Sequence, residues 1–164
     1  MGAHLNMTLE YARAVAGTRI SMPKPFIRGE KISLIGAISI NKIEAAMYGN
    51  WATDGEIFTH FIENDLLPIL RPEHIVLFDN VGFHKSMQVR KLIESTGAQI
   101  DLLPPYSPEM NPIEMTWSFA KAIVRKLEPR TMQQFQTAMK QALGKITEDK
   151  LVGWFEHAGY RSTH

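Results

Sequence analysis

Two carboxylates, Asp79 and Glu114, are the residues of this sequence whose types and spacing could do chemistry. Asp79 follows the apolar run of residues 75–78, and Glu114 closes the stretch L-P-P-Y-S-P-E-M-N-P-I-E, residues 103–114. Two carboxylates on the rim of one sheet can hold Mg²⁺ for phosphoryl transfer. Such a site normally takes a third carboxylate from a neighbouring strand, and we identify no residue for that position in the sequence.

The elements expected around these acids would bring them to one edge of a sheet. Residues 74–79 indicate a strand that ends in Asp79, and ligands of open α/β sheets gather beyond the carboxyl ends of parallel strands. Asn111 can cap a helix that has Pro112 in its first turn and runs to about residue 127. The proline-rich loop would thus deliver Glu114 onto the first turn of that helix.

On this helix Glu114 shares a stripe with Ser118, Lys121 and Arg125, at offsets of four, seven and eleven residues. A carboxylate on the same side as two cations suits a metal ligand beside a phosphate backbone. A second, apolar stripe should pack into the core. It consists of Ile113, Trp117, Ala120 and Val124.

The remaining pattern predicts strands followed by strand–helix alternation, which is typical of an α/β sheet with helices on its faces. Residues 1–30 read as irregular, residues 31–40 as a central strand, and residues 43–49 as its hairpin partner. The spacing of Thr53 and Glu56 fits a capping box for a helix to about residue 70. Further predictions are a helix over 85–95, a strand over 99–103, and C-terminal helices over about 131–158, the first with a capping box of Thr131 and Gln134.

Composition narrows the function classes only a little. The 164 residues are enough for one domain, are 45% apolar and 21% charged, and carry a net charge of +1. The absence of cysteine excludes disulfides and thiolate zinc sites. No apolar run approaches membrane-spanning length, and the start of the chain has no secretory signal pattern.

Each candidate also has an ordinary structural interpretation. A strand-end Asp followed by Asn and Gly is often a turn residue, and Glu114 is placed to be the reciprocal cap of its helix, worth about 1 kcal/mol. His84 can be a loop hydrogen-bonder. Lys121 and Arg125 can belong to a solvated helix face. No single residue decides between these interpretations.

The combination of motifs decides between the structural and the functional interpretations. The stretch from Asp79 to about residue 125 resembles the C-terminal half of the catalytic domain of DDE transposases, in particular of the bacterial insertion-sequence and mariner-like superfamily. The resemblance rests on Asp79-Asn80, His84, the segment L-P-P-Y-S-P of residues 103–108, the segment N-P-I-E of residues 111–114, and the 34 residues between the two acids. It extends with less specificity over about residues 1–160.

This resemblance implies an RNase H-like mixed sheet flanked by helices, in which Asp79 is the second acid and Glu114 the third. It implies a DNA transposase that uses Mg²⁺ or Mn²⁺, held about 3.5–4 Å apart as a pair, to cleave and transfer strands during DNA transposition and recombination. Asp79 and Glu114 would be both catalytic and metal-binding. Candidates for contact with DNA or for support of the site are Asn80, His84, Lys85, Asn111, Lys121 and Arg125.

The sequence differs from the family pattern at its N-terminal end. The family's first acid ends a strand shortly before a segment like residues 2–19, so we expect residues 1–164 to be an N-terminally truncated catalytic domain that lacks its first strand. Asp54, Asp65 and Asp101 are poor substitutes: the first suits a cap, the second an outer helix, and the third a strand in the wrong register. We therefore expect little activity from this chain alone.

Two alternatives stay open: a non-catalytic DNA-binding or assembly fragment of a transposase, and another RNase H-like nuclease. The expected partners are transposon-end and target DNA, and a separate upstream transposase product. A sheet without its first strand exposes a ladder edge of residues 31–40, so we also expect self-association, aggregation, or an N-terminal segment folded back over that gap. The implied location is the bacterial cytoplasm, at the nucleoid.

Overall fold

A computed structural model describes residues 2–4, 31–79 and 86–160 of the chain. Within these residues the strands are β1 (Gly2–His4), β2 (Lys31–Ile38), β3 (Ile43–Gly49), β4 (Ile75–Phe78) and β5 (Gln99–Leu102). The α-helices are α1 (Gly55–Phe61), α2 (Met87–Glu94), α3 (Pro112–Leu127), α4 (Met132–Leu143) and α5 (Glu148–His157). Shorter helical turns are η1 (Ile62–Leu66), η2 (Leu67–Ile69) and η4 (Pro108–Met110).

The strands form an antiparallel sheet of order β1-β2-β3 and a parallel pair, β4 and β5. The hairpin predicted from residues 31–49 is confirmed, with Ser33 opposite Gly49 and Ile38 opposite Ile43. The expectation that residues 1–30 are irregular is wrong for Gly2–His4, because this segment pairs with Lys31–Ser33. A three-residue strand has too few residues to show an alternating pattern, so this strand could not be predicted from the sequence.

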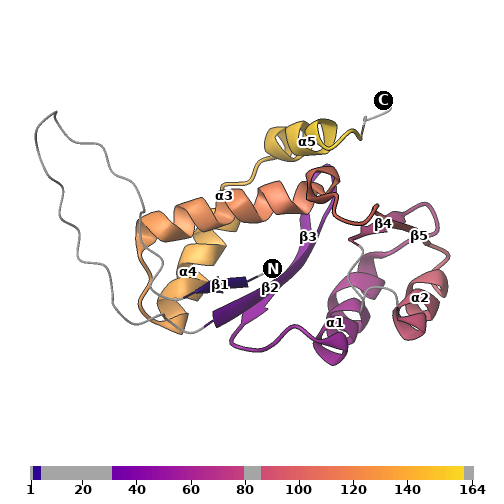
Figure 1. Ribbon diagram of the computed structural model, residues 1–164, viewed down its shortest axis with the longest axis horizontal. Helices are drawn as coiled ribbons and strands as arrows, with labels where there is room; N and C mark the ends of the chain where they lie inside the picture. The colour runs from indigo at the N-terminus through magenta and orange to yellow at the C-terminus, as the bar shows by residue number, and fades with distance from the viewer. Residues whose placement is uncertain (1, 5–30, 80–85, 161–164) are drawn as a thin grey trace, which may run out of the picture.

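Strand β2 is the centre of the core because its side chains are buried on both faces. Ile32 and Leu34 pack with α3 and α4, in a cluster that includes Trp117 and Phe135. Ile35 lies in a second cluster, which includes Phe58 of α1 and residues of β4 and α2. The helices α3 and α4 therefore cover one side of the antiparallel sheet, and α1 packs on the other (Figure 1).

The predicted helix after residue 54 is present, but its start differs from the prediction. Asp54, not Thr53, is the N-cap, and its side chain accepts hydrogen bonds from the backbone N–H groups of Glu56 and Ile57. An aspartate is an equally good N-cap, so the spacing alone could not choose between the two. The helical path continues from α1 through η1 and η2 to Ile69, which agrees with the predicted end near residue 70.

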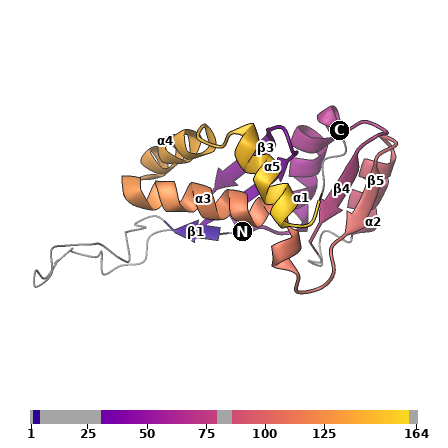
Figure 2. The same ribbon diagram turned by 90° about the horizontal axis from the view of Figure 1, so that it is seen from above.

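The second half of the chain follows the predicted order. Ser86 caps α2 through the N–H of Val89, Gly97 with φ +84° turns the chain into β5, and the Thr131–Gln134 capping box that starts α4 is confirmed. Helix α5 packs on α3, where the rings of Phe119 and Trp154 lie 5.7 Å apart. Figure 2 shows the β4–β5 pair and α2 at one end of the molecule and α4 at the other.

Candidate active site

Asp79 lies directly after β4, at the edge where the two parallel strands end. Phe78 is the last residue of β4 and pairs with Leu102 of β5. The pairing continues one step further, because the N–H of Leu103 donates to the carbonyl oxygen of Phe78 at 2.8 Å. The start of the proline-rich loop therefore lies beside Asp79, at the carboxyl edge of two parallel strands.

Glu114 lies in the first turn of α3, as predicted, but it is not part of a cap. The Asn111 side chain makes no capping hydrogen bond, although Asn111 precedes the helix and Pro112 begins it. The backbone N–H of Glu114 donates to the carbonyl oxygen of Asn111 at 3.1 Å. The Glu114 carboxylate accepts no hydrogen bond from the residues that the structure describes, so the interpretation of Glu114 as a reciprocal cap is wrong.

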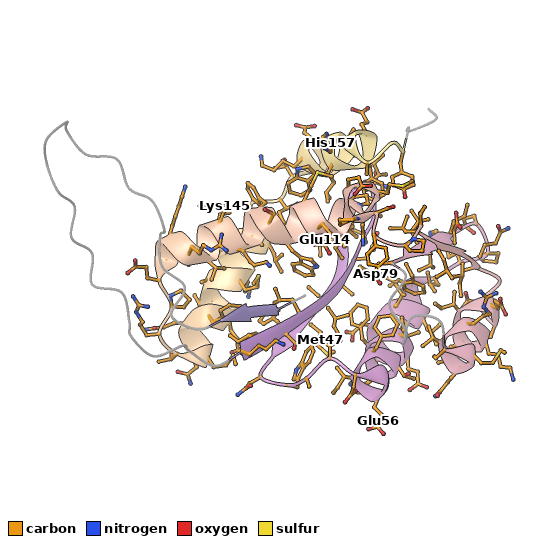
Figure 3. The ribbon with its side chains drawn as sticks, viewed as in Figure 1. Met47, Glu56, Asp79, Glu114, Lys145 and His157 are labelled. Atoms are coloured by element: carbon orange, nitrogen blue, oxygen red, sulfur yellow. The ribbon has the colours of Figure 1, made fainter. Side chains whose placement is uncertain are left out.

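The structure brings Asp79 and Glu114 near one another (Figure 3). Burial is the main cause that raises the pKa of Glu114, and the negative charge of Asp79 raises it further, while Lys121 acts in the opposite direction. Like charges raise the pKa of a carboxyl group only over short distances, because water and salt screen them. A strand end and a helix start thus place two carboxylates in one half-buried region.

Lys121 lies two helical turns after Glu114 and contributes a cation to the same region. Burial lowers the pKa of Lys121, and the charge of Arg125 lowers it further, whereas Glu114 raises it. These mutual effects agree with the predicted stripe of Glu114, Lys121 and Arg125 along one side of α3. Arg125 itself is exposed.

The opposite side of α3 fixes the helix against the sheet. Trp117, Ala120 and Val124 are buried, as the apolar stripe predicted, and the half-buried Ile113 packs against the same cluster. Gly36 of β2 makes this contact close, because a Cβ atom there would lie 2.8 Å from Cζ2 of Trp117. The position of Glu114 therefore depends on the packing of Trp117 over β2.

The structure describes one of the remaining predicted site residues and leaves the other three outside its described part. Asn111 is half-buried at the start of α3. Asn80, His84 and Lys85 lie outside the described residues. Tyr160 was not predicted to have a role, but its hydroxyl donates to the carbonyl oxygen of Met110 at 2.9 Å and ties the segment after α5 to η4. That contact joins residues 50 positions apart, and no local pattern indicates it.

The donor chemistry of this region fits a hard divalent cation, since two carboxylates offer oxygen ligands and their mutual repulsion would be relieved by a cation. Among the described residues, no group of three or more His, Cys, Asp or Glu is arranged to hold a metal ion. The other acids considered do not join the pair: Asp54 caps α1, and Asp65 and Asp101 are exposed on η1 and β5. The structure therefore offers two ligands in its described part.

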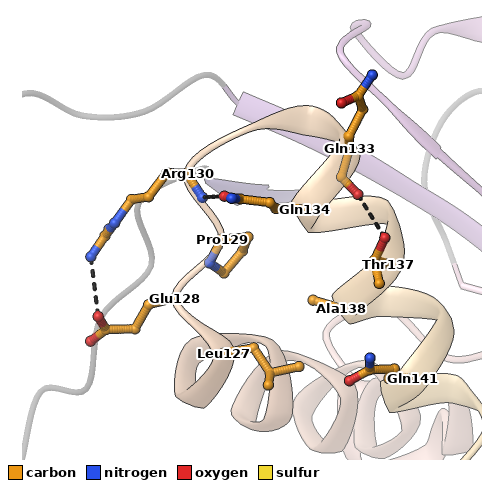
Figure 4. Close-up of a pocket in the computed structure, with 9 residues that line it drawn as sticks. All are labelled: Leu127, Glu128, Pro129, Arg130, Gln133, Gln134, Thr137, Ala138 and Gln141. Atoms are coloured by element: carbon orange, nitrogen blue, oxygen red, sulfur yellow. Dashed lines mark hydrogen bonds and ion pairs between the residues drawn. The ribbon is translucent and has the colours of Figure 1, made fainter.

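A groove of about 460 Å³ lies at the turn between α3 and α4 (Figure 4). Its polar groups largely satisfy one another: Arg130 pairs with Glu128 at 3.2 Å, and the Arg130 N–H donates to the Gln134 side chain at 2.8 Å. Glu128 comes fourteen positions after Glu114 along α3, which is about 20 Å at the rise of an α-helix. The groove is thus remote from the two carboxylates.

Comparison with known proteins places the chain in context. A family model described as DDE superfamily endonuclease matches residues 1–136. No curated protein matches the chain. Solved structures do match: a Mos1 strand transfer complex at TM-score 0.69 and 15% identity, a Mos1 transposase paired-end complex with the left transposon end at 0.71 and 16%, and a Mos1 mariner paired-end complex with Mn at 0.73 and 13%.

These structural matches cover 96–97% of this chain and 49–50% of the Mos1 chains, so the chain spans about half the length of the proteins it resembles. At these identities the likeness concerns the fold, which is the RNase H-like α/β fold that the sequence predicted. Among the described helices, none combines the length and apolar character needed to span a membrane.

Proposed function

We propose that this chain, which belongs to the DDE superfamily of endonucleases, uses Asp79 and Glu114 to hold Mg²⁺ or Mn²⁺ and forms part of a catalytic domain that cleaves and joins DNA strands in transposition. The observation that carries this proposal is the approach of the two carboxylates from separate elements, a strand end and a helix start. The structural neighbours support it, because Mos1 transposase forms complexes with transposon ends and a paired-end complex with Mn.

The chain's own residues have distinct parts in this proposal. Asp79 and Glu114 provide anionic oxygen ligands, and the raised pKa of Glu114 makes its ligand form sensitive to pH. When bound, the divalent cation would supply Lewis-acid polarisation of a phosphoryl oxygen and an activated water or hydroxyl. Lys121, half-buried beside Glu114, would hold a phosphate of the DNA backbone and neutralise part of its charge.

A cleavage assay tests the catalytic part of the proposal. Purified protein would be incubated with Mn²⁺ and end-labelled duplex DNA, beside Asp79→Asn, Glu114→Gln and the exposed-carboxylate control Glu109→Gln. We expect slow nicking that both site variants abolish and the control keeps. Nicking that survives Asp79→Asn would show that the reaction uses other residues.

A second candidate function is a DNA-binding or assembly domain without cleavage activity. It is favoured by the ligand set, because the described residues supply two carboxylates where metal geometry must be tightly fixed for phosphoryl transfer. The same assay separates the two functions. Salt-sensitive DNA binding that is unchanged in Asp79→Asn, together with no nicking in Mn²⁺, would assign the chain to the second.

A further inference from the structure

Tyr106 combines two properties that the fold does not explain. Its side chain is 100% exposed, and its backbone has φ 59°, in the left-handed region. Among the described residues the only other non-glycine with positive φ is Glu128, which ends α3 and donates its N–H to the carbonyl oxygens of Val124 and Arg125. Tyr106 ends no helix and buries no apolar surface. No packing contact in the described fold therefore accounts for its unfavourable backbone conformation.

The loop that carries Tyr106 is held in place. Pro104, Pro105 and Pro108 restrict its backbone. The N–H of Met110 donates to the carbonyl oxygen of Ser107 at 3.1 Å, and the Met110 carbonyl accepts the Tyr160 hydroxyl at 2.9 Å. A fixed loop presents an aromatic ring to a ligand at low entropic cost, since few conformations remain to be lost on binding.

The two ends of the loop join the two candidate metal ligands. At its start, Leu103 is hydrogen-bonded to Phe78, the residue before Asp79. At its end, Asn111 precedes the helix that carries Glu114. Three residue steps separate Tyr106 from Leu103, so their Cα atoms lie within about 11 Å of one another. This distance corresponds to about three base-pair steps of DNA.

We propose that Tyr106 stacks on an unpaired DNA base and thereby positions the strand beside Asp79 and Glu114. The inference rests on the proposed function, because it requires DNA at this site. An exposed, rigidly held ring is the chemistry that recognises base faces without preference for sequence. Base faces are accessible where a strand is single or frayed, so the ligand is an unpaired nucleotide next to a duplex end rather than uninterrupted duplex.

Photo-crosslinking with the full chain tests this assignment. The probe is a DNA hairpin with a short 3′ overhang that carries 5-iodouracil at one overhang position, and a blunt hairpin is the comparison. Wild type, Tyr106→Phe and Tyr106→Leu would be compared for overhang and blunt binding by fluorescence anisotropy. The crosslinked residue would be identified by mass spectrometry. Because Tyr106 is fully exposed, we expect all three proteins to fold alike, as circular dichroism would verify.

We expect the wild type and Tyr106→Phe to crosslink at position 106. For each probe, Tyr106→Phe should have the same affinity as the wild type. Tyr106→Leu should lose the crosslink and about tenfold in affinity for the overhang, with less than a twofold change for the blunt hairpin. Equal losses on both probes, or an unchanged overhang affinity with a crosslink elsewhere, would overturn the inference and leave DNA binding intact. A wild type that binds neither probe would overturn the proposed function and this inference with it.

Discussion

Asp79 lies close enough to Glu114 that its charge adds to burial in raising the pKa of Glu114, although 34 residues separate the two in the chain. A carboxyl group whose pKa is raised in the folded state favours folding when protonated. The contribution is present at low pH and is lost as the pH rises through the folded-state pKa. Ionised Glu114 therefore costs the folded protein stability in the absence of a cation.

Replacement of Glu114 by glutamine should remove this cost. We expect Glu114→Gln to match the wild type in unfolding free energy below the ordinary carboxyl pKa of 4.5 and to exceed it at pH 7–8. Urea unfolding at pH 4 and pH 7.5 in EDTA measures the difference. Glu109→Gln removes an exposed carboxylate of η4 and serves as the control, for which no such divergence is expected. A variant that is less stable than the wild type at pH 7.5 would contradict the assignment.

The packing of Trp117 on β2 should be sensitive to added volume. A Cβ atom at Gly36 would lie 2.8 Å from Cζ2 of Trp117 and 3.0 Å from the carbonyl oxygen of Ala45. Overpacking of this kind costs about 1–3 kcal/mol. We expect Gly36→Ala to lose about that much unfolding free energy in urea titrations and to weaken Mn²⁺ binding, because α3 carries Glu114.

The matched control is Gly153→Ala in α5, where a Cβ atom would meet nothing within 4 Å. Alanine is favoured over glycine inside a helix by about 0.5–1 kcal/mol, so this variant should be more stable than the wild type. Equal effects of the two substitutions would show that the contact between Gly36 and Trp117 is not close in solution.

Lys121 should make a measurable electrostatic contribution to DNA binding. We expect Lys121→Met to lower DNA affinity and to reduce the slope of log affinity against log salt by about 0.7–0.9, the value for one phosphate contact. Fluorescence anisotropy over a range of KCl concentrations measures both. Lys140→Met, which removes an exposed cation of α4, is the control and should change neither. A slope identical in Lys121→Met and wild type would remove Lys121 from the DNA interface.

The sequence predicted most of the elements, and it predicted that Asp79 ends a strand and that Glu114 lies in the first turn of a helix, because its strongest signals are local. The apolar stripe of Trp117, Ala120 and Val124, the capping box of α4, and the strand that precedes Asp79 each depend on residues within a few positions of one another. The resemblance of motifs then assigned the RNase H-like fold, which short-range patterns alone do not specify.

The structural features that could not be predicted depend on contacts between residues far apart in the sequence, or on a choice between two residues that suit the same position equally well. The short strand Gly2–His4 exists through its pairing with β2, and the bond of Tyr160 to Met110 spans 50 positions. The N-cap of α1 is Asp54 and not the predicted Thr53. The sequence could not distinguish the two because both residue types are good N-caps. The positive φ of Tyr106 has no signal in residue type, since tyrosine rarely adopts that conformation.

The central claim, that Asp79 and Glu114 hold one divalent cation together, is tested most directly by Mn²⁺ binding in a double-mutant cycle. Free Mn²⁺ would be measured by electron paramagnetic resonance at pH 7.5 for wild type, Asp79→Asn, Glu114→Gln and the double variant. We predict that either single substitution weakens Mn²⁺ binding at least tenfold and that the double variant is hardly weaker than the singles, because both ligands serve one ion. Wild-type Mn²⁺ affinity in both single variants would contradict the account.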